Sequence, residues 1–509
     1  MIHSSAPITS DLQKLATGSA MAFAGAVLGN GLTYLFGLIM GRFLGAESVG
    51  LYFLALVLMQ LASSLCRFGL PDALLRFVAI RVGEGNLSKL KGSILFSIAV
   101  TAAASIAVSA LLFVLAGPLS TDIFKQPELA PYVKWIAATL PFVAVMILLL
   151  NATQALKRMD LVVLSRDFIQ PITMIVSGLV FFYFMRGPAS FLAAYFGSMV
   201  LAFGTSIYFL VRACPDLGSS TSATFDGWKA LLAFSLPIAG ADVLHYLFRW
   251  SDTLLLSVLS SPSEVGVYNA AVRTTLLLNL LAVSVNSLYA PIIADHHHHG
   301  RHREIEVILK TLARWCLTLA LPLVFTMGVL SEEILSLWGT DFVAGSTALK
   351  VLAASQLIFI TSNLFAFTLL MCGRQYLELG NVAFVAFVNI AANLIMIPRY
   401  GVTGAALSML LSQAIGFFLR LVEVRCALGL RLYTSTYLKP LAALAPVSLL
   451  TATLYETLIK SAPVLAGGNI GAMLAVVLLI ATSYFGVLYL LGIEKEDLLI
   501  WSEVRLRRI

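Results

Sequence analysis

The sequence predicts an all-α polytopic membrane protein with about 14 transmembrane helices. Of its 509 residues, 59% are hydrophobic and only 12% are charged, whereas an ordinary soluble protein has about 25% charged residues. Apolar runs of about 20 residues, long enough to cross a bilayer as a helix, recur along the chain. The loops between them are short, which excludes a soluble catalytic domain within any loop.

The apolar runs give fourteen predicted spans in chain order. They lie near residues 18–41, 49–66, 92–116, 131–153, 161–184, 188–211, 231–258, 266–290, 311–331, 346–371, 376–397, 401–421, 438–457 and 469–492. On this assignment, 24 of the 33 Lys and Arg residues lie in the two tails, in the even-numbered loops or in the ends of the spans that border them. The positive-inside rule therefore predicts that both termini are cytoplasmic. The net charge of +7 follows from this loop bias and predicts no nucleic-acid partner.

Similar stretches recur at a constant offset along the chain. Val49-Gly50-Leu51-Tyr52 is matched by Val265-Gly266-Val267-Tyr268, and Arg158 is matched by Arg374 at the same offset. The two halves therefore look like copies of a six-helix unit, an arrangement that places transport sites between repeats. The predicted organisation is a cytoplasmic tail (1–17), an N-lobe (18–211), a cytoplasmic linker (212–230), a C-lobe (231–421), a second linker (422–437), two extra helices (438–492) and a cytoplasmic tail (493–509).

The predicted helix at 231–258 carries most of the charge at membrane depth. At about 100° per residue, Asp242, His245, Arg249 and Asp252 fall within an arc of about 80° on an otherwise apolar helix. Ionisable groups at this depth are costly unless they face protein or a water-filled cavity. We therefore predict that this helix lines a polar path.

Other polar stretches admit simpler interpretations. Arg273 falls near the expected depth of Arg249 but could equally extend to the interface. The basic stretch 67–91 fits orientation and contact with anionic headgroups better than substrate contact. The run His296 to His299 could bind a transition metal, yet a solvated loop lacks fixed ligand geometry, so we predict no metal site and no cofactor.

The combination of duplicated six-helix halves with certain motifs resembles the Wzx-type polysaccharide flippases. The motifs are Gly41-Arg42-Phe43-Leu44-Gly45 with Val49-Gly50-Leu51-Tyr52, then Pro237 and Asp252, then Val265-Gly266-Val267-Tyr268 with Ala271. These flippases form the polysaccharide transporter family of the multidrug, oligosaccharidyl-lipid and polysaccharide exporter superfamily. The resemblance implies a V-shaped bundle of two six-helix lobes in the bacterial cytoplasmic membrane.

The function implied by the resemblance is transport and not enzyme catalysis. An undecaprenyl-diphosphate-linked oligosaccharide would be flipped outward by alternating access, for polysaccharide biosynthesis beside a polymerase or ligase and among membrane lipids. We expect Arg249 and Arg273, with Asn269 and Asn30, to contact this substrate. Coupling to H⁺ or Na⁺ is expected at three further groups, namely Asp242, His245 and Asp252.

Other functions stay open at this point. A cation-coupled drug exporter or a lipid II flippase of the same superfamily would have a similar helix pattern. An acid-rich helix suits a cationic drug, whereas few arginines in the first two helices disfavour the lipid II flippase. A membrane glycosyltransferase or polymerase should show a large external loop or an acidic pair at a membrane boundary, and the external loops here are about 20 residues or less.

Overall fold

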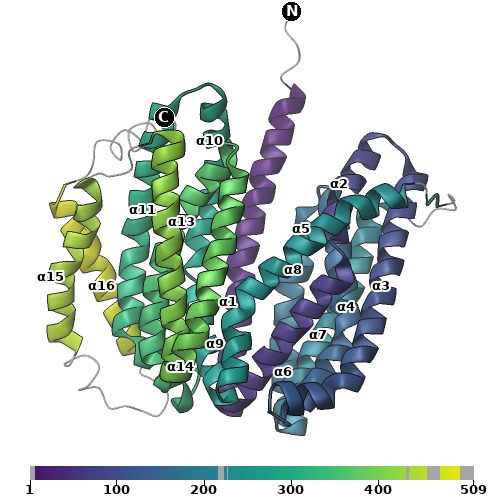
Figure 1. Ribbon diagram of the computed structural model, residues 1–509, viewed down its shortest axis with the longest axis horizontal. Coiled ribbons are helices and arrows are strands. Elements are labelled where there is room, and N and C mark those ends of the chain that lie inside the picture. Colours follow the sequence, from purple (N-terminus) through teal and green to yellow (C-terminus); the bar gives the residue numbers. More distant parts are fainter. Residues whose placement is uncertain (1–5, 216–222, 226, 431–434, 456–469, 493–509) are drawn as a thin grey trace, which may run out of the picture. The chain divides into compact units, whose positions relative to one another are not determined.

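The computed structural model describes residues 6–215, 223–225, 227–430, 435–455 and 470–492, and every regular element in these ranges is helical (Figure 1). The helices are α1 Ala6–Arg67, α2 Leu70–Gly83, α3 Leu87–Pro118, η1 Leu119–Ile123, α4 Leu129–Ala155, α5 Met159–Val163, η2 Leu164–Ile169, α6 Gln170–Met185, α7 Pro188–Ala213, α8 Trp228–Leu259, α9 Pro262–Leu276, α10 Asn279–His298, α11 His302–Val329, α12 Ser331–Ser336, η4 Thr340–Gly345, α13 Ser346–Met371, α14 Gln375–Leu428, η5 Ser435–Tyr437, α15 Leu438–Tyr455 and α16 Ile470–Leu490.

The helices account for the predicted spans. Eleven described stretches are long and apolar enough to cross a membrane, and α15 adds a shorter apolar helix. Two of the eleven each contain two predicted spans joined at a glycine: α1 breaks at Gly45 (φ 75°, ψ 176°) and α14 at Gly401 (φ 54°, ψ −129°). Only glycine adopts these backbone angles at little cost. The all-helical, multi-pass membrane fold is thus confirmed.

The chain forms two compact units, residues 1–269 and 270–509. Helix α8, which the repeat assigns to the second half, belongs to the first unit because it packs on α1 and α2. The backbones approach closely at Gly69, where an added Cβ would lie 2.3 Å from the Ser235 carbonyl oxygen. Gly69 also has a positive φ of 66°. Glycine is therefore required at this junction on two grounds.

Local geometry supports the internal repeat. Before α5, the N–H of Arg158 bonds the Thr153 carbonyl oxygen at 3.4 Å, and Lys157 has φ 59°. At the equivalent place before α14, Arg374 bonds Leu369 in the same way at 2.8 Å, and Gly373 has φ 75°. Both turns end a helix with the same left-handed cap.

The repeated Val-Gly-x-Tyr glycines meet each other within the first unit. An added Cβ on Gly50 would lie 1.8 Å from the Pro262 carbonyl oxygen, and one on Gly266 would lie 1.9 Å from that of Ala46. Ala46 and Pro262 are themselves related by the offset of the repeat. The contact is therefore reciprocal between equivalent positions, and it brings the backbones of α1 and α9 together.

The predicted linker at residues 212–230 lies partly outside the described residues. Its described portion docks on α3: the Thr224 N–H donates to the Ser88 carbonyl oxygen at 3.2 Å, and an added Cβ on Gly92 would lie 1.9 Å from the Thr224 carbonyl oxygen. Trp228 then packs on Phe96, with ring centroids 6.0 Å apart. The entry to α8 is thus anchored to the first unit.

Replacing Gly50 by alanine should destabilise the protein by about 1–3 kcal/mol, because α1 and α9 must separate to accept the methyl group. Thermal unfolding of the detergent-purified protein should show a lowered midpoint. The matched control is Gly197→Ala on α7, where an added Cβ meets nothing within 4 Å. That change should leave the midpoint equal or higher, since alanine favours helix over glycine by up to about 1 kcal/mol. Equal effects of the two changes would contradict the close contact.

Candidate functional site

Three of the ionisable groups on α8 line a polar cavity of about 230 Å³ in the first unit. The ends of neighbouring helices complete its wall: the last residue of α1, the first turn of α2, and α4 one turn before its end. The lining residues are Arg67, Pro71, Asp72, Asn151, Asp242, His245, Tyr246 and Arg249. Three of the four ionisable residues predicted to share one face of this helix therefore line a cavity.

Arg67 is buried in this wall. The residue is 8% exposed, and its Nε donates to the Ser63 carbonyl oxygen at 3.1 Å. Its guanidinium lies 5.9 Å from the centroid of the Tyr246 ring, close enough for a cation–π contact. Sequence reasoning assigned Arg67 to headgroup contact. No pattern in the sequence could link it to α8, because the link depends on the turn at Gly69.

The charges in the cavity balance. Asp242 lies within electrostatic range of Asp72, Arg67 and His245. Two aspartates therefore oppose two arginines, Arg67 and Arg249, around one cavity. Charges of opposite sign that line one cavity lower the cost of ionised groups at membrane depth. It also means that a ligand of either sign could bind if it displaced the matching counter-charge.

Asp252, the fourth ionisable group of the arc, lies elsewhere. Its side chain is buried and accepts a 2.8 Å hydrogen bond from the Tyr268 hydroxyl. Asn269 is also buried and donates to the Val265 carbonyl oxygen at 2.9 Å. The Asp252–Tyr268 bond holds α8 and α9 together at the end of the first unit where the repeated glycines meet.

The remaining candidate substrate residues do not line the cavity. Asn30 is exposed on α1, and its neighbour one turn on, Thr33, donates to the Gly29 carbonyl oxygen at 2.8 Å. Arg273 is half-buried on α9 and belongs to the second unit. Their substrate roles stay predictions.

The run His296 to His299 lies at the C-terminal end of α10. His299 lies 3.5 Å from Asp295 through its Nδ1 and the carboxylate, and the His297 and His302 ring centroids are 5.7 Å apart. Within the described ranges, no three His, Cys, Asp or Glu side chains are placed to hold a metal ion together.

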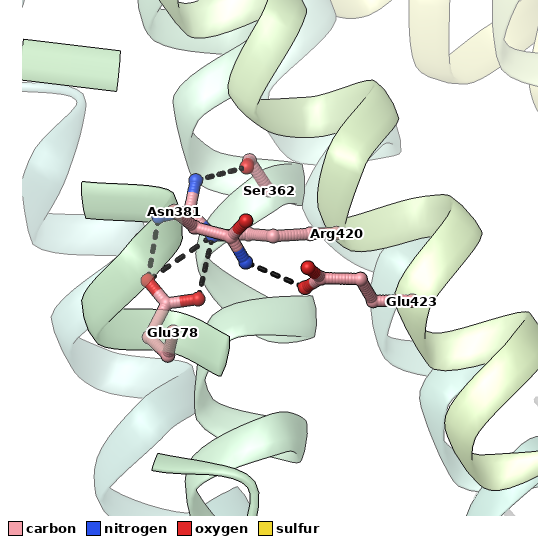
Figure 2. Close-up of polar contacts among 5 residues, drawn as sticks. All are labelled: Ser362, Glu378, Asn381, Arg420 and Glu423. Atoms are coloured by element: carbon pink, nitrogen blue, oxygen red, sulfur yellow. Dashed lines mark hydrogen bonds and ion pairs between the residues drawn. The ribbon is translucent and has the colours of Figure 1, made fainter. Parts of the chain in front are cut away.

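A second ionic cluster lies inside the second unit (Figure 2). Glu378, in the first turn of α14, receives a bidentate bond from Arg420 near the end of the same helix; the Nε to Oε2 distance is 2.9 Å. Arg420 also donates to the Ser362 hydroxyl of α13 at 3.0 Å. Both charged side chains are buried. The cluster thus connects α13 with both arms of α14, the segments before and after the break at Gly401.

A glycine makes room for this cluster. An added Cβ on Gly416 would lie 3.1 Å from Arg420 Nη1 and 2.8 Å from a methyl group of Val385. Beside it, Asn381 donates to Glu423 at 2.6 Å. Sequence reasoning missed the cluster, because Glu378 and Arg420 stand far apart in sequence at span ends and resemble interfacial charges. One feature of the sequence could have indicated the cluster: an acidic and a basic residue lie at matching depths of two adjacent predicted helices.

Comparison with known proteins places the chain among membrane transport proteins. The family model described as "Polysaccharide biosynthesis protein" matches residues 15–297, and the MatE model matches residues 237–400. Among solved structures, the chain resembles a lipid II flippase, MurJ, in an inward closed conformation. The TM-score is 0.72 at 16% identity, covering 94% of this chain and 99% of that one. At this identity the likeness shows the fold alone.

Two curated relatives add to the comparison. The chain is 23% identical over 193 residues to "Probable low-salt glycan biosynthesis flippase Agl15" of Haloferax volcanii, covering 38% of this chain and 41% of that protein. It is 20% identical over 458 residues to "Stage V sporulation protein B" of Bacillus subtilis, covering 84% of this chain and 86% of that protein. The match to the first relative thus spans less than half of that protein's length.

Glu378→Gln should destabilise the protein by about 3–5 kcal/mol, because it leaves the buried Arg420 charge without its partner. Its matched control is Asp160→Asn, which breaks an Arg–Asp pair with side chains 43% and 44% exposed and should cost less than about 1 kcal/mol. Denaturant unfolding of the two variants gives the comparison. The double change Glu378→Leu with Arg420→Met should recover most of the loss; a double variant as unstable as Glu378→Gln would contradict this account.

Proposed function

The chain belongs to the family of polysaccharide biosynthesis proteins, multi-pass membrane transporters of the exporter superfamily, and from this we propose that it flips a lipid-linked oligosaccharide. The single observation that carries the proposal is the charge-lined cavity of the first unit. Charged groups among apolar helices are costly, so two arginines and two aspartates around one cavity favour a transport role over a purely structural one.

The proposed cargo is an oligosaccharide linked through a diphosphate to undecaprenol. Its diphosphate requires cations, and Arg67 and Arg249 both line the cavity. Guanidinium groups pair with phosphate oxygens through two parallel hydrogen bonds, which gives both strength and orientation. Asn151 and Tyr246 add neutral polar groups suited to hydroxyls of a sugar. A wet cavity of this kind serves the hydrophilic part of the cargo and leaves the lipid tail to the bilayer.

The aspartates supply a means of coupling. Asp72 and Asp242 balance the two arginines around the cavity. Binding of H⁺ or Na⁺ at Asp242 would neutralise its carboxylate, and protonation of His245 would add a positive charge. Either change would make the cavity more positive and so favour the diphosphate. An ion that binds the two access states with different affinity shifts the equilibrium between them. Asp252 contributes differently, since its bond to Tyr268 favours a role in holding α8 to α9.

We also propose a cellular setting. The proposal sets the protein in the bacterial cytoplasmic membrane, with both termini cytoplasmic, on the basis of the loop charge bias. In that orientation the cavity lies near the cytoplasmic ends of α1 and α4, where newly made cargo is available. A polymerase or ligase on the outer side would then consume the flipped product.

A second candidate function is cation-coupled export of a drug. It is favoured by the two aspartates of the cavity, which suit a cationic ligand, and by the MatE match at residues 237–400. The two functions differ in the charge of the cargo. Transport of a fluorescent cationic drug by reconstituted protein, with no transport of lipid-linked oligosaccharide, would replace the flippase proposal.

Arg249→Ala should abolish flipping while the protein still inserts and folds, because the cargo diphosphate loses a bidentate partner. Loss of a close charge pair costs about 2–5 kcal/mol, or roughly 30-fold or more in apparent affinity. Arg249→Lys should restore part of the activity, since lysine keeps the positive charge but cannot form two parallel hydrogen bonds. Flipping is measured in proteoliposomes by access of a membrane-impermeant sugar probe to lipid-linked oligosaccharide.

The matched control for this test is Arg212→Ala, which removes an exposed arginine at the end of α7. It should flip at the rate of the unaltered protein. Normal flipping by Arg249→Ala, or equal loss in the control, would exclude the proposed role of Arg249. Arg67→Ala should resemble Arg249→Ala if both arginines face the same diphosphate.

Asp242→Asn should uncouple transport from the ion gradient, because an amide cannot take up a proton or balance a cation. We expect flipping by this variant to respond little to an imposed pH or sodium gradient, while binding of the cargo is retained. The measurement is the flipping rate with and without each gradient in the same proteoliposomes. A response to the gradient equal to that of the unaltered protein would place the coupling group elsewhere.

A further inference from the structure

The second unit contains a cavity of different character, about 370 Å³ in volume. It lies between α11, α13 and the second arm of α14, and Tyr437 at the end of η5 closes one part of its wall. All but two of its lining side chains are hydrocarbon. Neither the family nor the charged cavity of the first unit accounts for it.

The shape of this cavity follows the helix axes. Along α13 its wall runs from Leu357 to Phe365, about two turns of helix and therefore about 12 Å. Thr361, midway, has its hydroxyl bonded to the Leu357 carbonyl oxygen at 3.2 Å, so it offers little to a polar ligand. An elongated apolar space fits a hydrocarbon chain and excludes a sugar, whose hydroxyls would remain unbonded.

One end of the cavity is polar. The Tyr437 hydroxyl is buried and has no hydrogen-bond partner among the described residues. Burial raises the pKa of Tyr437 to about 12, and the nearby Arg314 guanidinium opposes that rise. The hydroxyl is therefore a neutral donor at physiological pH. A buried donor without a partner is unfavourable, and a bound acceptor would satisfy it.

Arg314 is 6% exposed, and its charge acts on the Tyr437 hydroxyl. Arg420 is close in sequence to the lining residues Phe417 and Leu421, and its guanidinium is bonded to Glu378 and Ser362 (Figure 2). Phe365 and Leu421 lie in the last two turns of their helices. The cavity thus extends into the last two turns of α13 and α14.

We propose that this cavity binds an anionic phospholipid of the surrounding bilayer, with one acyl chain between α11, α13 and α14 and the phosphate at Tyr437 and Arg314. The charge complementarity selects an anionic head, and the apolar length selects a chain. A bound phospholipid would fill the space between the helices of the second unit and so support the flanking Glu378–Arg420 cluster. The site is separate from the cavity that we assign to the cargo.

The test uses native mass spectrometry of the full chain. Detergent-purified protein is stripped of lipid and incubated with equal amounts of phosphatidylglycerol and phosphatidylcholine. We expect one phosphatidylglycerol to be retained in preference. Tyr437→Phe, which removes one oxygen atom, should lower its retention about tenfold through loss of a hydrogen bond to a charged group. Ala313→Leu, which fills the cavity from α11, should lower retention of both lipids.

The control is Leu319→Phe, which enlarges a side chain on the exposed face of the same helix. It should retain phosphatidylglycerol like the unaltered protein. Equal retention by Ala313→Leu and this control would overturn the proposal, as would unchanged retention by Tyr437→Phe. A third incubation adds undecaprenyl phosphate as competitor; its retention in place of phosphatidylglycerol would also overturn the assignment to a bilayer phospholipid.

Discussion

The cost of an unpaired charge inside a bilayer constrains this molecule more than any other single interaction. Two charged clusters of the structure show how that cost is met. The aspartates and arginines of the first unit face each other around a cavity, and Arg420 is enclosed by Glu378 and Ser362. The same rule thus accompanies a charge-lined cavity in one unit and a buried ion pair in the other.

Close backbone contact is the second constraint. Without a hydrophobic drive between helices in lipid, packing depends on small residues that let backbones approach. Gly50 and Gly266 do this at the contact between α1 and α9, and Gly69 does it where the turn between α1 and α2 meets α8. The Gly69 contact lies next to the cavity, since Arg67 and Asp72 flank it on either side. A glycine thus positions the charged groups without touching a ligand itself.

Equivalent positions of the repeat carry side chains of different polarity. Tyr52 and Tyr268 occupy equivalent places in the two halves. Tyr52 packs on the Phe36 ring, 6.3 Å between centroids, whereas Tyr268 donates to the Asp252 carboxylate at the position equivalent to Phe36. The two halves therefore differ in polarity at these equivalent positions. The polarity of α8, absent from the matching part of α1, follows the same pattern.

The membrane class, the fourteen apolar segments, the repeat and the charged face of α8 could all be predicted from the sequence, because these depend on composition and on the period of a single helix. That charged face includes three of the cavity residues, namely Asp242, His245 and Arg249. The folded chain was needed to show that Arg67, Asp72 and Asn151 join them, that Asp252 bonds Tyr268, and that Glu378 meets Arg420. Those outcomes depend on turns and on close approach between helices, and local periodicity holds no information about either.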